Sequence, residues 1–442
     1  MLHRARTFLQ TPAHIAPLVT FRVVIGAMMV FSTLRFWWLG WIEDHFIQPQ
    51  FHFKYFGFAW VEALPPFWMY ALHAVMILSA LGVMLGAYFR ISSVFLFLTF
   101  TYTELIDLTY YLNHYYFVSL VLLLLMFTPA HRYFSVDALR MKKEEIHIPR
   151  MWILSFQLLL AIVYTYAGLA KLNYDWLINA LPLKIWLPAS DNIPVFGFLF
   201  DWKYAPYLFS WFGMLYDCTI VFWLWNTRTR LWAYLTVIIF HLLTGILFQI
   251  GMFPLVMIGA TLIFFSEQWH IKLVSWFKRQ LHYPQLSIVN CQSSIVNCLL
   301  LTIFLTFQLL FPLRHLLYPG NLFWTEEGYR FSWRVMLMEK AGTAAFYVKD
   351  SKTNKEGVVV NSDFLNPHQE KQMAMQPDMI LQFAHFLRDH YNKQGMTHPM
   401  VRAEVYVTLN ARPSELLIDP NVNLAAIEDG WKPKPWILPA PK

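Results

Sequence analysis

Long apolar segments separated by short polar loops dominate the first 320 residues of the chain. A helix needs about twenty apolar residues to cross a membrane, and the pattern predicts about nine such spans. Two of the segments are shorter, so we expect them to be tilted or buried inside a helical bundle. The predicted spans are 17–41, 66–88, 91–110, 115–128, 152–170, 205–225, 231–248, 252–266 and 298–318.

From about residue 322 the pattern changes, because charged residues and turn-forming residues return. Alternation of apolar and polar positions predicts strands at 331–338, 344–350, 358–361 and 403–410. Residues 377–393 have helical periodicity, with Pro377 at the start. The sequence therefore predicts a mainly α fold: a polytopic membrane bundle over residues 1–320 and a small α+β extracytoplasmic domain over residues 321–442.

Composition supports a membrane protein, because 57% of the residues are hydrophobic and only 14% are charged. Placing the N-terminus in the cytoplasm puts the basic loops around Arg90, Arg132, Arg228 and Lys278 on the inside, as the positive-inside rule requires. An odd number of spans then leaves the C-terminal region outside. The net charge of +7 reflects this orientation, and no dense basic cluster with interleaved aromatic residues indicates nucleic-acid binding.

The three cysteines are too few for a disulfide framework. Cys291 and Cys298 lie in a tandem heptapeptide, SIVNCQS-SIVNC, whose spacing matches no metal motif. We assign these two cysteines no catalytic role. The length and the tandem repeat are typical of a bacterial protein, so we expect an integral, multi-pass protein of a bacterial inner membrane.

Lys171 is the strongest candidate for chemistry, because it directly follows the uncharged span 152–170. Desolvation disfavours the charged form of a lysine, and a neutral lysine is a base. The alternative is an interfacial lysine that extends its ammonium group to water. Gly168 lies three residues earlier on the same helical face, where its missing side chain leaves room for a flat ring.

Three further polar residues are expected at the same membrane level. Asn113 and His114 lie at the outer start of one span, and His241 lies about seven residues, or about 10 Å, inside the outer end of another. The four groups can therefore meet in the outer half of the bilayer. Alternatively, Asn113 and His114 cap a helix, and His241 makes an interhelical hydrogen bond.

Four ordered segments carry a resemblance to a known family. They are LNHYYFVSLVLLLLMFTPAHRYFSVDALR at 112–140, IVYTYAGLAKLNYDWL at 162–177, FHLLTGILFQIGMFPLVM at 240–257, and WTEEGYRFSW at 324–333 followed by IDPNV at 418–422. Together they resemble the vitamin K-dependent γ-glutamyl carboxylase family and its bacterial relatives with a horizontally transferred transmembrane domain. The resemblance covers almost the whole chain.

The resemblance implies a membrane enzyme that oxygenates reduced vitamin K and uses the strong base so formed to remove a γ-proton from peptidyl glutamate, which then captures carbon dioxide. It implies reduced vitamin K, O2 and CO2 as reactants and no metal. The expected partners are the lipid bilayer, a quinone and a glutamate-containing peptide or protein. Carried over by motif, Lys171 is the base, His114 and His241 bind quinone oxygens or developing charge, and Asn113 orients the site.

The same resemblance places the segment of Trp324, Tyr329 and Trp333 beside the active site, in contact with quinone or substrate. Aromatic residues at this level also mark the membrane interface in many proteins. Arg412 is a candidate for binding a glutamate carboxylate, because guanidinium groups suit planar anions. The alternative for Arg412 is a solvated loop residue.

Two other functions remain compatible with the sequence. One is a quinol epoxidase or oxygenase that does not carboxylate peptides. The other is a non-enzymatic membrane transporter or assembly protein, although transporters often contain internal repeats and the spans show no such duplication.

Overall fold

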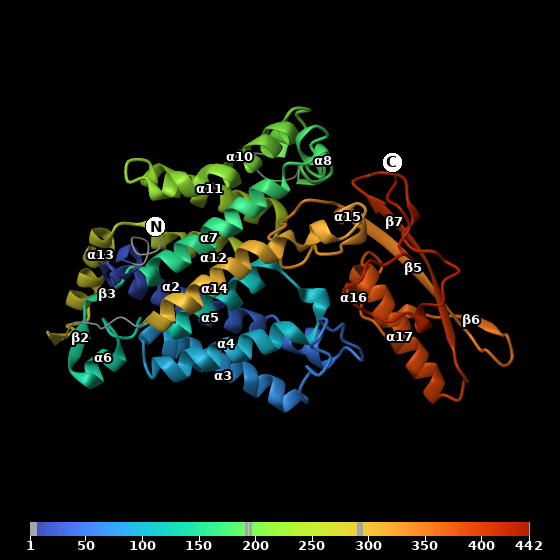
Figure 1. The fold of residues 1–442 in the computed structure, drawn as a ribbon, viewed down its shortest axis with the longest axis horizontal. Coiled ribbons are helices and arrows are strands. Elements are labelled where there is room, and N and C mark those ends of the chain that lie inside the picture. The colour runs from blue at the N-terminus through green and yellow to red at the C-terminus, as the bar shows by residue number, and fades with distance from the viewer. Residues whose placement is uncertain (1–6, 191–192, 194–196, 290–294, 442) are drawn as a thin grey trace.

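The computed structural model describes residues 7–190, 193, 197–289 and 295–441. Within them, seven helices are long and apolar enough to cross a membrane. They run side by side along the long axis of the molecule (Figure 1). They are α2 (Ala16–Trp38), α3 (Pro66–Leu85), α4 (Phe89–Ile106), α7 (Met151–Ala170), α10 (Ala205–Trp225), α11 (Arg230–Phe248) and the span Cys298–Leu317, which joins α14 (Ile295–Leu310) to a 3-10 helix (Phe311–Leu317).

Two shorter apolar helices complete the bundle and match the two short segments of the sequence pattern. They are α5 (Asn113–Phe127) and α12 (Phe253–Thr261), which a 3-10 turn (Leu262–Phe264) extends. All the predicted spans are therefore apolar helices. Several begin with proline in the first turn, where the missing N–H costs nothing, as Pro66 does in α3 and Pro254 does in α12. Gly86 ends α3 in the left-handed conformation, with a φ of 64°.

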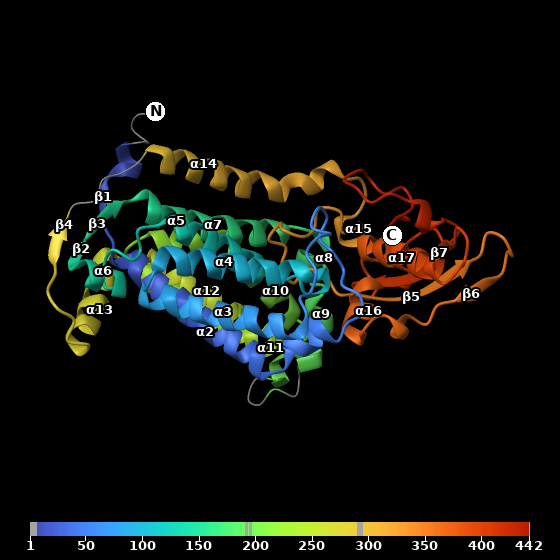
Figure 2. The same cartoon turned by 90° about the horizontal axis from the view of Figure 1, so that it is seen from below.

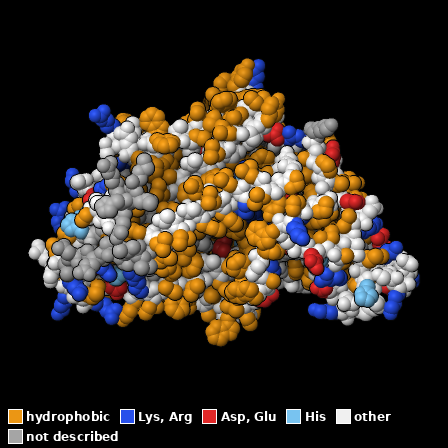
Figure 3. All heavy atoms as spheres, in the orientation of Figure 1, with side chains coloured by type: hydrophobic (Ala, Val, Ile, Leu, Met, Phe, Trp, Pro, Cys, Tyr) orange, Lys and Arg blue, Asp and Glu red, His pale blue; other side chains and the backbone are white. Residues whose placement is uncertain are grey.

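Most helices of the bundle pack against helices that are close to them in the sequence. Helix α3 packs against α2 and α4, α4 packs against α5, and α10 packs against α7 and α11. Figure 2 shows α14 along one side of the bundle, and side chains on the surface of the bundle are predominantly hydrophobic (Figure 3). This is the arrangement expected where lipid surrounds the helices.

One end of the bundle carries short strands and surface helices (Figure 2). Strand β1 (Pro12–His14) pairs with β3 (His147–Pro149), and β2 (Lys143–Glu145) pairs in parallel with β4 (Ser287–Val289). Helices α6 (Val136–Met141) and α13 (Glu267–Gln280) lie at the same end. These are the basic loops assigned to the cytoplasm. Residues 290–294 of the tandem repeat, which include Cys291, lie outside the described residues.

The C-terminal region lies at the other end (Figure 1). Its antiparallel sheet has the order β6-β5-β7-β8, formed by β6 (Glu356–Val358), β5 (Lys340–Lys349), β7 (Met400–Leu409) and β8 (Glu415–Leu416). Helices α16 (Pro367–Met373) and α17 (Pro377–Lys393) pack against it. The strands predicted at 344–350 and 403–410 fall on β5 and β7, and the predicted helix 377–393 is α17. The strand predicted at 358–361 is wrong except for Val358, because β6 ends there and a 3-10 helix (Asn361–Asp363) begins three residues later.

The strand predicted at 331–338 is wrong. Phe331, Trp333 and Met336 have positive φ values of 57°, 59° and 53°, which break an extended strand. Such left-handed conformations are rare for bulky residues and persist only where the surroundings hold them. The segment is an irregular loop that crosses from the short helix α15 (Leu322–Thr325) to β5.

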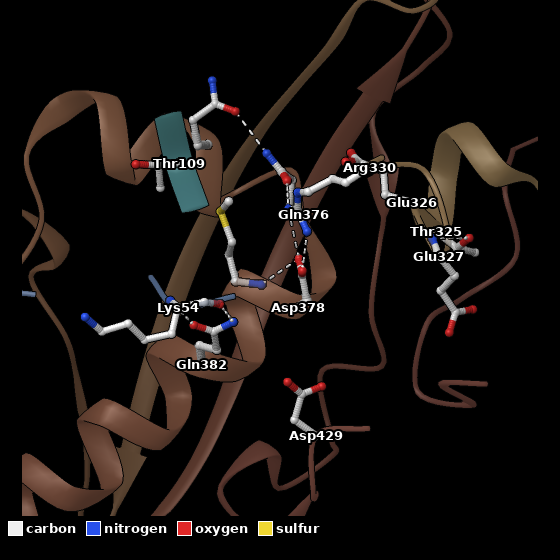
Figure 4. A network of polar contacts seen from close by, with 12 residues as sticks. Lys54, Thr109, Thr325, Glu326, Glu327, Arg330, Gln376, Asp378, Gln382 and Asp429 are labelled. Carbon is white, nitrogen blue, oxygen red and sulfur yellow. Dashed lines mark hydrogen bonds and ion pairs between the residues drawn. The ribbon is translucent and has the colours of Figure 1, made fainter. Parts of the chain in front are cut away.

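Partly buried polar contacts hold this loop to the C-terminal region. The Arg330 guanidinium forms an ion pair with Asp378 of α17 and donates to the Gln376 side chain, as Figure 4 shows. The Lys340 ammonium donates to Glu326 Oε1 at 2.8 Å and to the Trp324 carbonyl at 2.9 Å. These contacts fix both ends of the 324–340 segment.

The outer loops of the bundle join the core of the C-terminal region. Phe53 and Leu108 are buried in the same hydrophobic cluster as α17. The Gln369 amide donates to Asp107 Oδ2 at 2.8 Å and to the Phe51 carbonyl at 2.7 Å. The bundle and the C-terminal region are thus packed together at the level where α5 begins.

Candidate active site

A cavity of about 400 Å³ lies in the half of the bundle nearest the C-terminal region. Its walls come from α5, α7, α10, α11 and α12, and the 333–336 loop forms part of the lining. Side chains of Asn113, His114, Lys171, His241 and Trp333 all line it. The structure therefore brings together the four residues expected at one membrane level, which come from α5, from α11 and from the residue after α7.

Lys171 does not extend to water. It follows the last residue of α7, and its Nζ donates to Asp217 Oδ2 of α10 at 2.7 Å and to the Ala167 carbonyl at 3.2 Å. The two side chains of this ion pair are only 8% and 7% exposed. Nζ also lies 5.3 Å from the centre of the Trp176 ring. The lysine is held inside the cavity wall and not at the membrane surface.

Gly168 has a different position from the one expected. A Cβ atom there would lie 2.6 Å from Cys218 Sγ and 2.7 Å from the Cys218 backbone nitrogen. Gly168 thus lets α7 and α10 approach closely beside the ion pair, and it does not line the cavity. Gly213 of α10 does line it, and a Cβ there would meet the Lys171 stem at 3.9 Å.

His241 of α11 is 1% exposed. Its Nε2 lies 3.1 Å from the Tyr164 hydroxyl of α7, and its Nδ1 has no hydrogen-bond partner among the described residues. The interhelical hydrogen bond expected as an alternative is therefore present. It leaves one ring nitrogen of His241 available for a further contact.

His114 and Asn113 lie in the first turn of α5, and neither side chain caps that helix. The His114 ring packs against Phe253, with 5.6 Å between ring centres, and makes no hydrogen bond with the residues that the structure describes. Asn113 accepts a hydrogen bond from the Tyr111 hydroxyl at 3.1 Å and donates to the Arg334 carbonyl at 2.8 Å. Asn113 thus connects the bundle to the loop that borders the cavity.

The three aromatic residues of the 324–333 segment occupy different surroundings. Trp333 is buried, lines the cavity and stacks on Tyr116 with 5.0 Å between ring centres. Its indole nitrogen has no hydrogen-bond partner in the described part of the chain. Trp324 is buried in the C-terminal core, where its indole N–H donates to the Leu438 carbonyl, and Tyr329 lies beside Phe323. Neither lines the cavity.

Arg412 is also away from the cavity. Its guanidinium forms a bidentate ion pair with the Asp175 carboxylate, and both N–O distances are 2.8 Å. This contact with Arg412 lowers the pKa of the Asp175 carboxyl group. A substrate carboxylate would have to displace Asp175, so the assignment of Arg412 to substrate stays a prediction.

Sequence reasoning did not assign Asp217 and Tyr164, the partners of the lysine and of His241. A signal for Asp217 was present, because it is the only charged residue in the span 205–225. An acidic residue inside a span is costly and points to a functional site. Nothing in the sequence pattern indicates that Tyr164 faces a histidine of another helix.

A second cavity of about 550 Å³ adjoins the first. The two share Trp186, Leu247, Phe248 and Met336, and the second is also lined by Ser190 and Gln249. It lies beyond the outer end of α11, beside the helix α9 (Leu183–Trp186). The first cavity is almost entirely apolar, whereas the second has a large polar share of its lining.

Two family models match the chain. One is described as an HTTM domain and matches residues 10–269, and the other is described as the lumenal domain of vitamin K-dependent gamma-carboxylase and matches residues 293–442. No solved structure matches the chain. The first match covers more than half of the sequence, and the second covers the C-terminal region. The apolar helices indicate an integral membrane protein, and the match to a lumenal domain indicates that the C-terminal region is its extracytoplasmic part. The chain belongs to the vitamin K-dependent γ-glutamyl carboxylase family, and its domains support a function of the vitamin K-dependent carboxylase kind.

Proposed function

We propose that this protein is a vitamin K-dependent γ-glutamyl carboxylase and epoxidase of a bacterial inner membrane, which couples oxygenation of reduced vitamin K to carboxylation of glutamate. The observation that carries the proposal is the buried Lys171–Asp217 pair in the wall of an apolar cavity. A charged pair in such a place is costly to desolvate, so its presence points to function. The two family matches support the same reaction.

The cavity suits a reduced naphthoquinone. Its lining is apolar apart from a few groups, as ligand sites for flat hydrophobic molecules generally are. His241 Nδ1 and Trp333 Nε1 belong to lining residues and are buried without a partner in the described structure. These two nitrogens supply hydrogen-bonding capacity that the protein itself does not use, which fits a ligand with oxygens at two positions.

Lys171 is the base toward the quinol in this proposal. Its proton is shared with Asp217, and transfer of that proton to the carboxylate leaves a neutral amine and a neutral acid. Apolar surroundings favour this uncharged pair over the ion pair. The neutral Nζ then accepts a hydroxyl proton from the quinol, while Asp217 keeps the lysine directed into the cavity. The Trp176 ring, whose centre lies 5.3 Å from Nζ, also contacts the lysine.

His241 and His114 are assigned to the oxygens of the bound ring. The Tyr164 hydroxyl fixes the His241 ring through Nε2, which leaves Nδ1 as the contact for the ligand. His114 has both nitrogens available among the described residues. Asn113 positions the 331–336 loop, and through it Trp333, by its bond to the Arg334 carbonyl. When bound, reduced vitamin K supplies the oxygen-driven base strength that no side chain here possesses.

The second cavity is the proposed entrance for the glutamate side chain of the acceptor. It has polar lining and joins the first cavity at Trp186 and Met336. The indole N–H of Trp186 donates to the Glu339 carboxylate at the start of the sheet. A peptide at this mouth would reach the ring site without crossing lipid.

The decisive experiment uses the purified full chain in lipid nanodiscs with reduced vitamin K, oxygen, labelled bicarbonate and a short glutamate peptide. Vitamin K epoxide and labelled carboxyglutamate are measured separately. Formation of both supports the proposal. Epoxide alone would show a quinol epoxidase without carboxylation, and neither product, from protein that is folded and binds the quinol, would refute an enzymatic role.

A further inference from the structure

The wall of the active-site cavity is open toward the lipid between two helices. Leu208 and Phe212 of α10 and Ile239 of α11 line the cavity. The same side chains are 57%, 51% and 66% exposed on the outer surface. A side chain that lines a cavity and is also more than half exposed lies at its mouth. All three are apolar and belong to membrane-spanning helices, so this mouth opens to lipid and not to water.

The opening is confined to the outer part of the two helices. Leu208 and Phe212 lie within about 10 Å of the outer end of α10 at 1.5 Å per residue. One turn deeper, the Tyr216 ring of α10 stacks on Phe240 of α11 with 4.0 Å between ring centres, and the helices are closed against each other. Ile239 directly precedes Phe240 on α11, and the Phe212 ring lies 6.2 Å from the Phe240 ring. The opening is therefore a slot that reaches inward to the level of the Tyr216–Phe240 stack.

We infer that this α10–α11 slot holds the polyprenyl tail of the quinol, with the ring inside the cavity beside Lys171 and the tail continuing into the bilayer. The inference rests on the proposed function and names the ligand as a quinol with a long tail. The slot is continuous with the ring cavity, and the residues at its mouth carry no polar group that could pair with a headgroup.

The physical role of the slot is orientation. A prenyl tail is as apolar as the surrounding lipid, so moving it from lipid into the slot gains little hydrophobic free energy. If the tail stays in the slot, the quinol ring can enter the cavity in only one orientation. This fixes the position of the ring relative to Lys171 and favours reaction. A bulky residue at the mouth should then lower kcat/KM for a quinol with a tail more than for a quinol without one.

The first test compares menaquinol-4 with 2,3-dimethyl-1,4-naphthoquinol, in which a methyl group replaces the tail. The variants Leu208→Trp and Ile239→Trp narrow the mouth. Leu215→Trp and Leu242→Trp are the matched controls, because these leucines are about half exposed on the same helices and do not line the cavity. We expect the ratio of kcat/KM for epoxidation of menaquinol-4 to that of the tailless quinol to fall about tenfold in the mouth variants only.

An equal loss for both quinols in the mouth variants, or the same ratio change in the controls, would overturn the inference while leaving the proposed function intact. Failure of the wild-type protein to oxygenate either quinol would instead refute the proposed function. The two failures are therefore distinguishable.

A second test does not depend on turnover. Menaquinone-4 with a photoreactive diazirine at the end of its tail is added to the full chain in nanodiscs, illuminated and mapped by peptide mass spectrometry. We expect labelling of residues 205–216 and 236–246 that excess unlabelled menaquinone-4 suppresses. Labelling confined to α3 or α4, or suppressed by added phospholipid and not by menaquinone-4, would overturn the assignment of the slot.

Discussion

Lys171 at the end of α7 and Asp217 within α10 form an ion pair with an N–O distance of 2.7 Å, and both side chains are more than nine-tenths buried. The pair carries no net charge whichever partner holds the proton. It therefore places a potential base inside an apolar cavity without the full cost of an isolated charge. The sequence indicated a single desolvated lysine as the base. In the proposed mechanism the Lys171–Asp217 pair takes that role.

The first prediction concerns the lysine. Lys171→Ala should abolish epoxide formation, because no other amine lines the cavity within the described residues. Small exogenous amines should restore part of the turnover, since the variant leaves space where the side chain was. Epoxide formation is measured by chromatography with and without added amine.

The control for this variant addresses the charge left behind. Removing one partner of a buried pair costs about 3–5 kcal/mol, because the other charge is uncompensated. The double variant Lys171→Met/Asp217→Asn leaves no charge and should fold, yet remain inactive. Near-normal epoxide formation in either variant without added amine contradicts the assignment of Lys171 as the base.

The second prediction concerns the contact between α7 and α10. Gly168→Ala places a Cβ 2.6 Å from Cys218 Sγ, next to Asp217, and forces the helices apart. We expect a loss of stability of about 1–3 kcal/mol from this overpacking and a marked loss of epoxide formation. Thermal unfolding in detergent and epoxidation rates measure the two effects.

Gly213→Ala is the matched control, because a Cβ there meets only Trp176 and the Lys171 stem, at 3.8 Å and 3.9 Å. These are ordinary van der Waals distances, so this variant should keep its stability. If Gly168→Ala is as stable as Gly213→Ala and keeps wild-type epoxidation, close packing at Gly168 does not position the pair.

The membrane helices could be predicted because a span is a local property of the sequence. Apolar length located the apolar helices that the structure describes in the bundle, including the two short ones, and the helix at 377–393 followed from its periodicity. The loop at 331–338 could not be predicted in this way. Its alternating pattern resembles a strand, but contacts from Arg330 and Asn113 hold it in an irregular path.

The site could be predicted only in part, for a related reason. Membrane depth placed Lys171, His114 and His241 at one level, and the cavity contains all three. Depth does not tell which way a helix is rotated, and this is why Gly168 was expected in the cavity but faces α10. It also explains why Asp217 and Tyr164 emerged only from the contacts between helices.

The third prediction concerns pH and the Arg330–Asp378 pair. Burial raises the pKa of the Asp378 carboxyl group, but the Arg330 guanidinium outweighs this effect and holds the pKa below its ordinary value. A depressed carboxyl pKa contributes stability that is complete above the unfolded pKa of about 3.9 and is lost as the pH falls through the lower folded value. The stability advantage of the wild type over Asp378→Asn should therefore be constant near neutrality and shrink below about pH 4.

Hydrogen–deuterium exchange of the β5 and β7 amides in the full chain, corrected for intrinsic exchange, measures this difference. Glu356→Gln is a suitable control, because its carboxylate pairs with Arg402 on the surface and a surface pair contributes little. A wild-type advantage over Asp378→Asn that stays unchanged down to about pH 3 would contradict the argument.

The last prediction concerns the order of the chemistry. Lysine and histidine have ordinary pKa values of about 10.4 and 6.5, far too low for either to remove a γ-proton from a carboxylate side chain. In the proposed mechanism, oxygenation of the quinol must therefore supply the driving force before carbon dioxide is captured. Epoxide formation should equal or exceed incorporation of labelled carbon dioxide under every condition, including saturating peptide. Wild-type protein and Lys171→Ala are compared with and without oxygen, and both products should disappear together in the variant and in the anaerobic samples. Labelled carbon dioxide that enters the peptide without oxygen or reduced quinone would show that glutamate is activated by a different route.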